Sequence, residues 1–91
     1  MSKTKDQQMA KYFKALGHPV RLQILRQLQE FGACFSGDIS GQLPVVASTA
    51  SQHLKILKEA GFIIGTVEGT RRCYCLQNKA FLDLKDWVAR L

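Results

Sequence analysis

The sequence predicts a small, mainly α-helical domain that carries one β-hairpin, an α+β fold. Three observations lead to this prediction. Apolar residues recur at helical spacing in the first two thirds of the chain, the period changes to that of strands near residue 62, and a helical pattern returns from residue 78. The 91 residues suffice for one domain. We expect a flexible basic tail over residues 1–6 and a folded domain over residues 7–91.

Two helices are predicted before residue 32. Apolar side chains recur over residues 7–16, and Gly17 ends this pattern. The second helix begins at Pro19, because proline is favoured in the first helical turn, and it ends at Gly32. Its expected buried positions are Val20, Leu22, Leu25 and Leu28.

A minimal strand and a short helix are expected next. The apolar run over residues 33–35 (Ala-Cys-Phe) is long enough for one short strand near Cys34. Ser36 is a good N-cap residue, and Asp38 in the first turn would complement the helix dipole. This third helix is short, because Pro44 ends it.

The fourth helix, from about Val46 to Ala60, has the most informative pattern, and Gly61 is its natural left-handed cap. An apolar stripe faces a core through Ala50, Leu54, Leu57 and Ala60. The other faces carry short donors and acceptors and one cation, a set that suits base edges and phosphates in a DNA major groove: Ser48, Thr49, Ser51, Gln52, His53 and Lys55. Taken alone, the pattern fits an ordinary amphipathic surface helix equally well.

The last third of the chain predicts a hairpin over residues 62–76 and a closing helix capped by Asn78. Two helices joined by a tight turn and followed by a hairpin make a winged helix-turn-helix, here in the order ααα-α-ββ-α. The fourth helix would enter the major groove. Arg71 and Arg72, near the tip of the wing, would meet phosphate or the minor groove.

The terminal helices carry much apolar surface for so small a domain. We expect them to form a homodimer interface, although the same residues could complete an intramolecular core. The expected interface residues are Met9, Phe13, Phe81, Leu84, Trp87, Val88 and Leu91.

Composition narrows the class of protein. A net charge of +6 and a pI of about 9.6 favour a polyanionic partner such as double-stranded DNA. No apolar run approaches the roughly 20 residues that span a bilayer, and the polar start lacks the apolar stretch of a secretion signal. We therefore expect a cytoplasmic protein with no membrane partner. Recognisable catalytic sets and phosphate-binding glycine loops are absent from the sequence, which argues against an enzyme.

The three cysteines allow two interpretations. Cys73 and Cys75 point to one face of a predicted strand, with Cα atoms about 6.5–7 Å apart, too far for an easy disulfide. If residues 33–35 pair with that strand, Cys34 approaches them. Three thiolates would suit As(III), Cu(I) or, with a fourth ligand, Zn(II), and a disulfide of Cys34 with either partner is a second route to a switch. Alternatively, all three are small apolar residues that pack the wing sheet.

The chain resembles the ArsR/SmtB family of repressors, small dimeric winged-helix proteins often released from DNA by metals or metalloids. The resemblance spans about Gln7 to Leu91 and rests on the segments FKALGHPVRLQIL (13–25), STASQHLKIL (48–57), EAGFI (59–63) and GTRRCY (69–74). It implies a homodimer on a pseudo-palindromic operator. It also implies that Ser48, Ser51, Gln52 and His53 face the DNA and that Arg71 and Arg72 contact it from the wing.

The chain departs from the family pattern at three places. The N-cap of the fourth helix is Val46 or Ala47, where the family often has serine or threonine. The Cys-Val-Cys box at the head of the third helix is replaced by a run with one cysteine, Cys34. The last helix has Asp83 and Asp86 but no histidine. Neither of the two well-known metal sites therefore carries over.

Three functions remain compatible with these observations. The first is a homodimeric, sequence-specific DNA-binding repressor, released by a thiophilic metal or metalloid ion or by thiol oxidation. The second is such a regulator without an effector of this kind. The third is a winged-helix protein-interaction module that does not bind DNA. That module would normally lose basic residues on the wing and the fourth helix, whereas this chain keeps Lys55, Lys58, Arg71 and Arg72.

Overall fold

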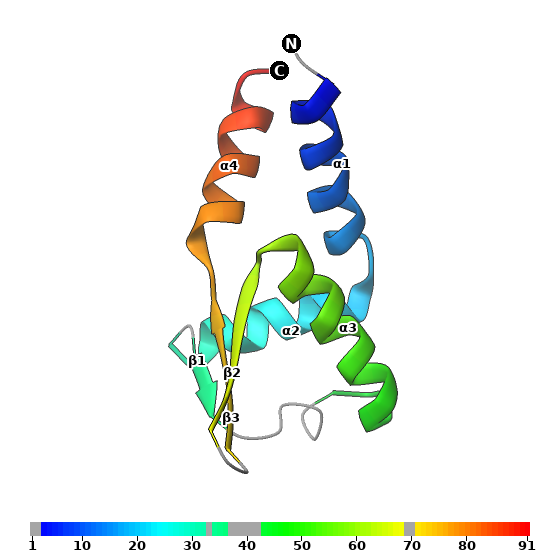
Figure 1. The fold of residues 1–91 in the computed structure, drawn as a ribbon, viewed down its shortest axis with the longest axis vertical. Helices are drawn as coiled ribbons and strands as arrows, with labels where there is room; N and C mark the ends of the chain where they lie inside the picture. The colour runs from blue at the N-terminus through cyan, green and yellow to red at the C-terminus, as the bar shows by residue number, and fades with distance from the viewer. Residues whose placement is uncertain (1–2, 33, 37–42, 69–70) are drawn as a thin grey trace.

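The computed structural model describes residues 3–32, 34–36, 43–68 and 71–91 (Figure 1). These ranges contain four helices and three strands: α1 (Lys3–Leu16), α2 (Pro19–Glu30), β1 (Cys34–Ser36), α3 (Ala47–Ala60), β2 (Ile63–Glu68), β3 (Arg71–Leu76) and α4 (Asn78–Ala89). The short helix predicted to end at Pro44 falls largely on residues 37–42, which lie outside the described residues.

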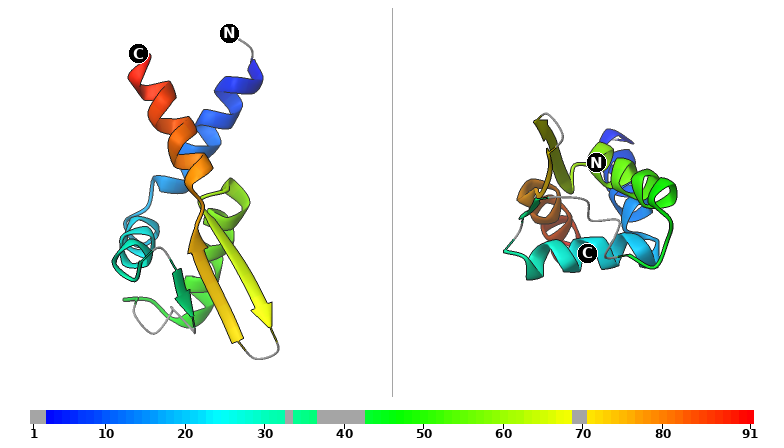
Figure 2. Two further views of the ribbon diagram at one scale, coloured as in Figure 1. Left: turned by 90° about the vertical axis from the view of Figure 1, so that its left-hand side faces the viewer. Right: turned by 90° about the horizontal axis from the view of Figure 1, so that it is seen from below.

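The terminal helices α1 and α4 form one end of the molecule, and α2, α3 and the three strands form the other (Figures 1 and 2). Both chain termini lie at the α1–α4 end, and the molecule extends 44 × 22 × 22 Å. An edge-to-face contact joins Phe13 and Trp87, whose ring centroids are 5.7 Å apart. The Tyr12 hydroxyl also donates to the Asp83 carboxylate at 3.3 Å. α1 and α4 are therefore attached to each other by side chains within one protomer.

The sheet is antiparallel, with strand order β1-β3-β2. β3 lies in the centre, and its residue Cys75 pairs with Cys34 on one side and Ile64 on the other. The short strand predicted near Cys34 is confirmed. It gives the hairpin a third strand, which matters because an isolated two-stranded hairpin is only marginally stable.

The helix ends show which local signals decided the element boundaries. His18 is the N-cap of α2, and its Nδ1 accepts a hydrogen bond from the Val20 amide at 3.1 Å. Gly61, with φ of 93°, caps α3 and donates to the Leu57 and Lys58 carbonyls. Val46 is the N-cap of α3 and makes no side-chain cap hydrogen bond. The departure from the family's usual serine or threonine therefore leaves this helix start without a side-chain cap.

Two predicted boundaries were wrong. α1 begins at Lys3, so residues 3–6, which were assigned to the tail, are helical. The N-cap of α4 is Gln77 rather than Asn78, and it makes no side-chain cap hydrogen bond. The Gln77 amide instead donates to the Phe62 carbonyl at 2.8 Å, and this tertiary hydrogen bond sets where the strand ends and the helix begins.

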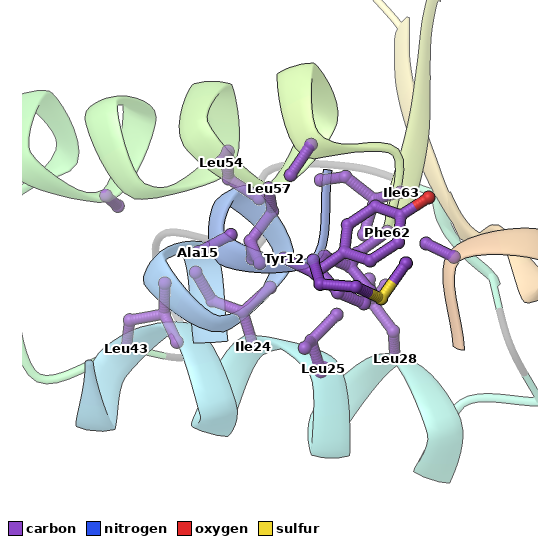
Figure 3. Close-up of a cluster of buried hydrophobic side chains, with 14 residues drawn as sticks. Tyr12, Ala15, Ile24, Leu25, Leu28, Leu43, Leu54, Leu57, Phe62 and Ile63 are labelled. Carbon is purple, nitrogen blue, oxygen red and sulfur yellow. The ribbon is translucent and has the colours of Figure 1, made fainter. Parts of the chain in front are cut away.

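One apolar core fills the space between α1, α2, α3 and the start of β2 (Figure 3). Phe62 is fully buried, and its ring contacts those of Tyr12 and Phe81 at centroid distances of 5.4 and 4.8 Å. The predicted stripe of α3 is confirmed, since all of its members are buried. The buried residues are Met9, Tyr12, Ala15, Ile24, Leu25, Leu28, Leu43, Ala50, Leu54, Leu57, Ala60, Phe62, Ile63 and Ala80.

Two predicted assignments of apolar residues differ from the structure. Leu22 was expected in the core but is exposed, because the buried face of α2 is formed by Ile24, Leu25 and Leu28. Met9 was expected at a dimer interface, but it is buried inside the protomer. Helical spacing predicted that Leu22 and Met9 lie on apolar faces of their helices. It did not predict whether the protomer's own core would cover each side chain.

We expect Leu57→Ala to lower the free energy of unfolding by about 2–5 kcal/mol, because Leu57 is fully buried and its truncation leaves a cavity. Ile56→Ala is the matched control on the same helix, since Ile56 is exposed. Its cost should stay below about 1 kcal/mol. Urea denaturation followed by circular dichroism measures both values, and equal losses would contradict the orientation of α3.

Candidate nucleic-acid interface

The outer face of α3 presents a continuous set of polar side chains. Ser48, Ser51, Gln52 and Lys55 are all exposed. Their spacing places them on one side of the helix, opposite the buried stripe. Thr49, which was predicted with them, is half-buried at the edge of this face. Burial of the apolar stripe thus turns four short or flexible hydrogen-bonding side chains outward together.

His53 lies in a different environment from the other predicted DNA-facing residues. It is half-buried, and its ring centroid is 4.4 Å from that of His18. Its Nδ1 is inaccessible and has no hydrogen-bond partner among the described residues. Burial lowers the pKa of His53 below the usual value of 6.5, and the nearby charges of His18 and Arg21 lower it further. This ring therefore favours the neutral form and packs α3 against the start of α2.

The position of His53 could have been inferred from its spacing. It follows buried Ala50 by three residues and precedes buried Leu57 by four. Residues at these separations lie on the same side of a helix, so His53 belongs to the edge of the apolar stripe.

The wing begins beside α3. Arg71 and Arg72 are the first two residues of β3, paired in register with Glu68 and Val67 of β2, and their side chains lie outside the described part of the structure. A cleft of about 240 Å³ separates α3 from β3. Its lining residues are Ser51, Leu54, Lys55, Lys58 and Tyr74.

Tyr74 is placed in this cleft by the absence of a side chain at Gly65. The two residues are register partners on β3 and β2. A Cβ at Gly65 would lie 3.1 Å from the Tyr74 ring and 3.8 Å from Cδ of Lys58. The tyrosine therefore occupies the space that a larger residue would need, between the hairpin and the basic side of α3.

The three cysteines gather on one face of the sheet. Cys34 and Cys75 are joined by a disulfide, with Cα atoms 4.0 Å apart, and Cys73 Sγ lies 3.9 Å from Cys75 Sγ. Because side chains alternate along a strand, the cysteines of β3 lie on the face opposite Tyr74 and hence away from α3. Cys34 is exposed, and the other two are half-buried. The alternative that all three cysteines pack the wing sheet fits the half-buried Cys73 and Cys75 better than the exposed Cys34.

The metal prediction is not supported in this state. Within the described residues, no group of three or more histidine, cysteine, aspartate or glutamate side chains is arranged to hold a metal ion. Cys34 and Cys75 are bonded to each other, whereas metal binding requires thiolates. A thiophilic ion at Cys34, Cys73 and Cys75 stays a prediction for the reduced protein.

The α1–α4 end carries exposed apolar side chains. Phe13, Val88 and Leu91 are 43%, 46% and 84% exposed, and Leu82, which the sequence analysis did not select, is 61% exposed. Phe81, Leu84 and Trp87 are half-buried and pack against the protomer's own core. Of the predicted interface residues, the structure therefore leaves Phe13, Val88 and Leu91 most accessible to a partner.

Across the described part of the chain, no helix is long and apolar enough to cross a membrane.

Comparison with known sequences identifies related regulators. Residues 18–64 match the family of bacterial regulatory proteins described as the arsR family. An HTH-type transcriptional regulator of Methanocaldococcus jannaschii is 41% identical over 70 residues, which are 77% of this chain and 79% of that protein. The arsenical resistance operon repressor of Bacillus subtilis is 35% identical over 82 residues, 87% of this chain and 78% of the repressor. The regulator CmtR of Mycobacterium tuberculosis is 32% identical, and the match spans only 60% of its length.

Comparison with solved structures gives the same fold. An ArsR family transcriptional regulator superposes with a TM-score of 0.83 at 20% identity, covering 93% of this chain and 87% of that one. A homodimeric winged helix-turn-helix DNA-binding domain from Mycobacterium bovis superposes with a TM-score of 0.71 at 30% identity, covering 99% and 87% of the two chains. The predicted winged helix-turn-helix is therefore confirmed.

We expect His53→Gln to reduce the acid sensitivity of folding. Because the folded-state pKa of His53 is lowered, the unfolded chain binds the proton more readily, so this residue destabilises the fold as the pH falls below 6.5. Above about pH 7.5 His53 is neutral in both the folded and the unfolded chain, so its contribution to the free energy of unfolding no longer changes with pH. Urea denaturation between pH 5 and pH 8 should give a flatter stability profile for the variant. If the stability of the wild type and of His53→Gln changed with pH in parallel, His53 would not be a source of the acid sensitivity.

Proposed function

This chain belongs to the arsR family of bacterial regulatory proteins and is a DNA-binding transcriptional regulator, and we propose that it is a repressor that binds a pseudo-palindromic operator as a homodimer. The observation that carries this proposal is the outer face of α3. Ser48, Ser51, Gln52 and Lys55 are exposed together on a helix whose opposite face is fully packed. A rigidly held helix with a polar outer face is what direct reading of a major groove requires.

Base reading is assigned to the short polar residues of this face. Gln52 can pair with the N6 and N7 atoms of adenine, and Ser48 and Ser51 can reach several base edges or phosphates. His53, with its ring partly buried against His18, is assigned mainly to positioning α3 and only at its exposed edge to the DNA. Thr49 flanks the reading face.

Phosphate binding is assigned to basic residues of α3 and of the wing. Lys55 and Lys58 line the α3–β3 cleft on the helix, and Arg71 and Arg72 begin the strand of the wing. The net charge of +6 supports this assignment. Contacts of this kind fix the register on the duplex and make affinity decrease with salt.

Dimerisation is assigned to the α1–α4 end. The accessible side chains of Phe13, Val88 and Leu91, together with Leu82, would be covered by the same surface of a second copy. The Mycobacterium bovis relative is homodimeric, which supports this assignment. Two copies related by a twofold axis would present two α3 helices to half-sites about one helical turn apart.

We expect Gln52→Ala and Arg72→Ala to affect binding differently. Loss of a base contact should cost about 1–3 kcal/mol of discrimination at one base pair, whereas loss of a phosphate contact weakens all duplexes and reduces the salt slope by about 1. Fluorescence anisotropy on duplexes from the promoter of its own gene, with single-base variants and a salt series, separates the two. Gln29→Ala, an exposed glutamine of α2, is the control.

These measurements also test the proposed function as a whole. A repressor should lower transcription of a reporter placed behind the bound promoter, and Gln52→Ala should relieve this effect. If the wild-type protein binds no duplex at moderate salt, the chain would instead fit a winged-helix protein-interaction module.

We expect Val88→Glu to produce monomers, because the carboxylate would be buried without a partner in the proposed interface. Val88 is exposed in the protomer, so its folding should be little affected. Ala89→Glu, at an exposed neighbouring position, is the matched control for added charge. Analytical ultracentrifugation gives the mass of each variant. A Val88→Glu protein that remains dimeric would contradict this interface.

A further inference from the structure

We propose that β1 and β3 form a thiol–disulfide exchange site in which Cys34 and Cys75 react with small disulfides and thereby control the DNA affinity of the repressor. The proposal rests on the function proposed above and names its regulation. Three observations carry it: the pairing of two cysteines across the sheet, their accessibility, and the segment that their bond encloses.

The first observation is the geometry of the pair. Cys34 and Cys75 are directly opposite in the β1–β3 register, and they form a disulfide. Cys73 is near Cys75, with sulfur atoms 3.9 Å apart, but the two lie on the same strand. Residues two apart on a strand are separated by about 6.5–7 Å between Cα atoms, more than a disulfide easily spans. In the β1–β3 register Cys73 lies opposite Ser36, so Cys75 rather than Cys73 is the partner of Cys34.

The second observation is that the pair faces outward. Cys34 is exposed and Cys75 is half-buried, on the side of the sheet opposite Tyr74. A small disulfide can thus react first with Cys34, and Cys75 is close enough to attack the resulting mixed disulfide. Small reagents need no displacement of α3 or the core to enter.

The exchange proceeds in two balanced steps. The Cys34 thiolate attacks one sulfur of a small disulfide RSSR, which forms a mixed disulfide and releases one RS⁻. The Cys75 thiolate then attacks the Cys34 sulfur, which forms the Cys34–Cys75 bond and releases the second RS⁻. Two protein thiols are oxidised, the small disulfide is reduced to two thiols, and the two protons pass to these thiols through solvent. An excess of a small thiol reverses both steps.

The third observation is what the bond encloses. The two cysteines are 41 residues apart, and the loop between them contains all of α3 and β2 and the start of the wing strand, Arg71 and Arg72. Every residue assigned to DNA contact therefore lies inside the closed loop.

The bond should therefore weaken DNA binding. Reduction leaves β1 and β3 joined only by their strand pairing, and the wing can then shift relative to α3 as it contacts the duplex. Oxidation bonds β1, which follows α2, to β3 of the wing, and the wing can then no longer shift in this way. The reduced protein is the form that binds tightly, and the oxidised form is released.

The test compares the protein treated with oxidised glutathione with the protein treated with dithiothreitol. Disulfide mapping by mass spectrometry should find Cys34 joined to Cys75, and anisotropy on the promoter duplex should show at least tenfold weaker binding after oxidation. The thermal midpoint of the oxidised form should be higher by roughly 10 °C, because the closed loop restricts the unfolded chain.

Three variants make the test specific. Cys34→Ser and Cys75→Ser should bind DNA as tightly as the reduced wild type and should lose the tenfold response. Cys73→Ser is the matched control and should keep both the disulfide and the response. The proposal would be overturned if Cys34→Ser still lost affinity for DNA on oxidation. It would also be overturned if the oxidised wild type, with its Cys34–Cys75 bond mapped, bound DNA as tightly as the reduced wild type.

Failure of the regulatory proposal can be distinguished from failure of the proposed function. If the reduced wild type binds no duplex, the repressor proposal fails, and the regulatory proposal fails with it, whatever disulfide is mapped. If the reduced protein binds DNA but forms no Cys34–Cys75 bond under oxidation, only the exchange site is refuted.

Discussion

The fold depends on the burial of Phe62 at the point where α3 passes into the sheet. Its ring is enclosed by Tyr12 of α1 and Phe81 of α4. Its amide donates to the Leu57 carbonyl, and its carbonyl accepts from the amide of Gln77. One residue therefore joins the end of α3, the beginning of the hairpin and the junction between β3 and α4, and it sets their relative positions.

The burial of Phe62 also explains how so small a domain can hold the outer side of α3 in one orientation. Since the stripe of α3 and Phe62 are buried together, the opposite side of the helix is turned outward with little freedom to rotate. The hairpin begins at the same point, because β2 follows Phe62 directly in the chain. Tyr74, seated over Gly65, completes the contact between them. The outer face of α3 would then be oriented before a duplex binds.

β3 connects the three parts of the molecule to which we assign functions. Its first residues, Arg71 and Arg72, belong to the wing, and Cys75 is bonded to β1. Leu76 and Gln77 lead directly into α4, which carries the exposed apolar residues of the proposed dimer interface. A change at Cys75 therefore acts on the strand that links the wing to α4.

The sequence by itself determined the features that depend on neighbouring residues along the chain. Helical period predicted the buried stripe of α3, Gly61 predicted its left-handed end, and the change of period at Phe62 predicted the hairpin. The start of α2 at Pro19 was also correct, because the restricted φ of proline acts within one helical turn. These signals sufficed for the fold and for the four exposed polar residues of α3 that we propose to contact DNA.

The tertiary structure decided every question about which partner covers a residue. The apolar spacing of α1 did not reveal that Met9 enters the core while Phe13 remains accessible, and the polar pattern of α3 did not reveal that His53 packs against His18. The cysteine spacing predicted a shared face but not that Cys34 would bond to Cys75 rather than Cys73. The physical reason is the same in each case. A repeating pattern specifies on which side of an element a residue lies, whereas its contacts depend on strand register and helix packing between segments far apart in the chain.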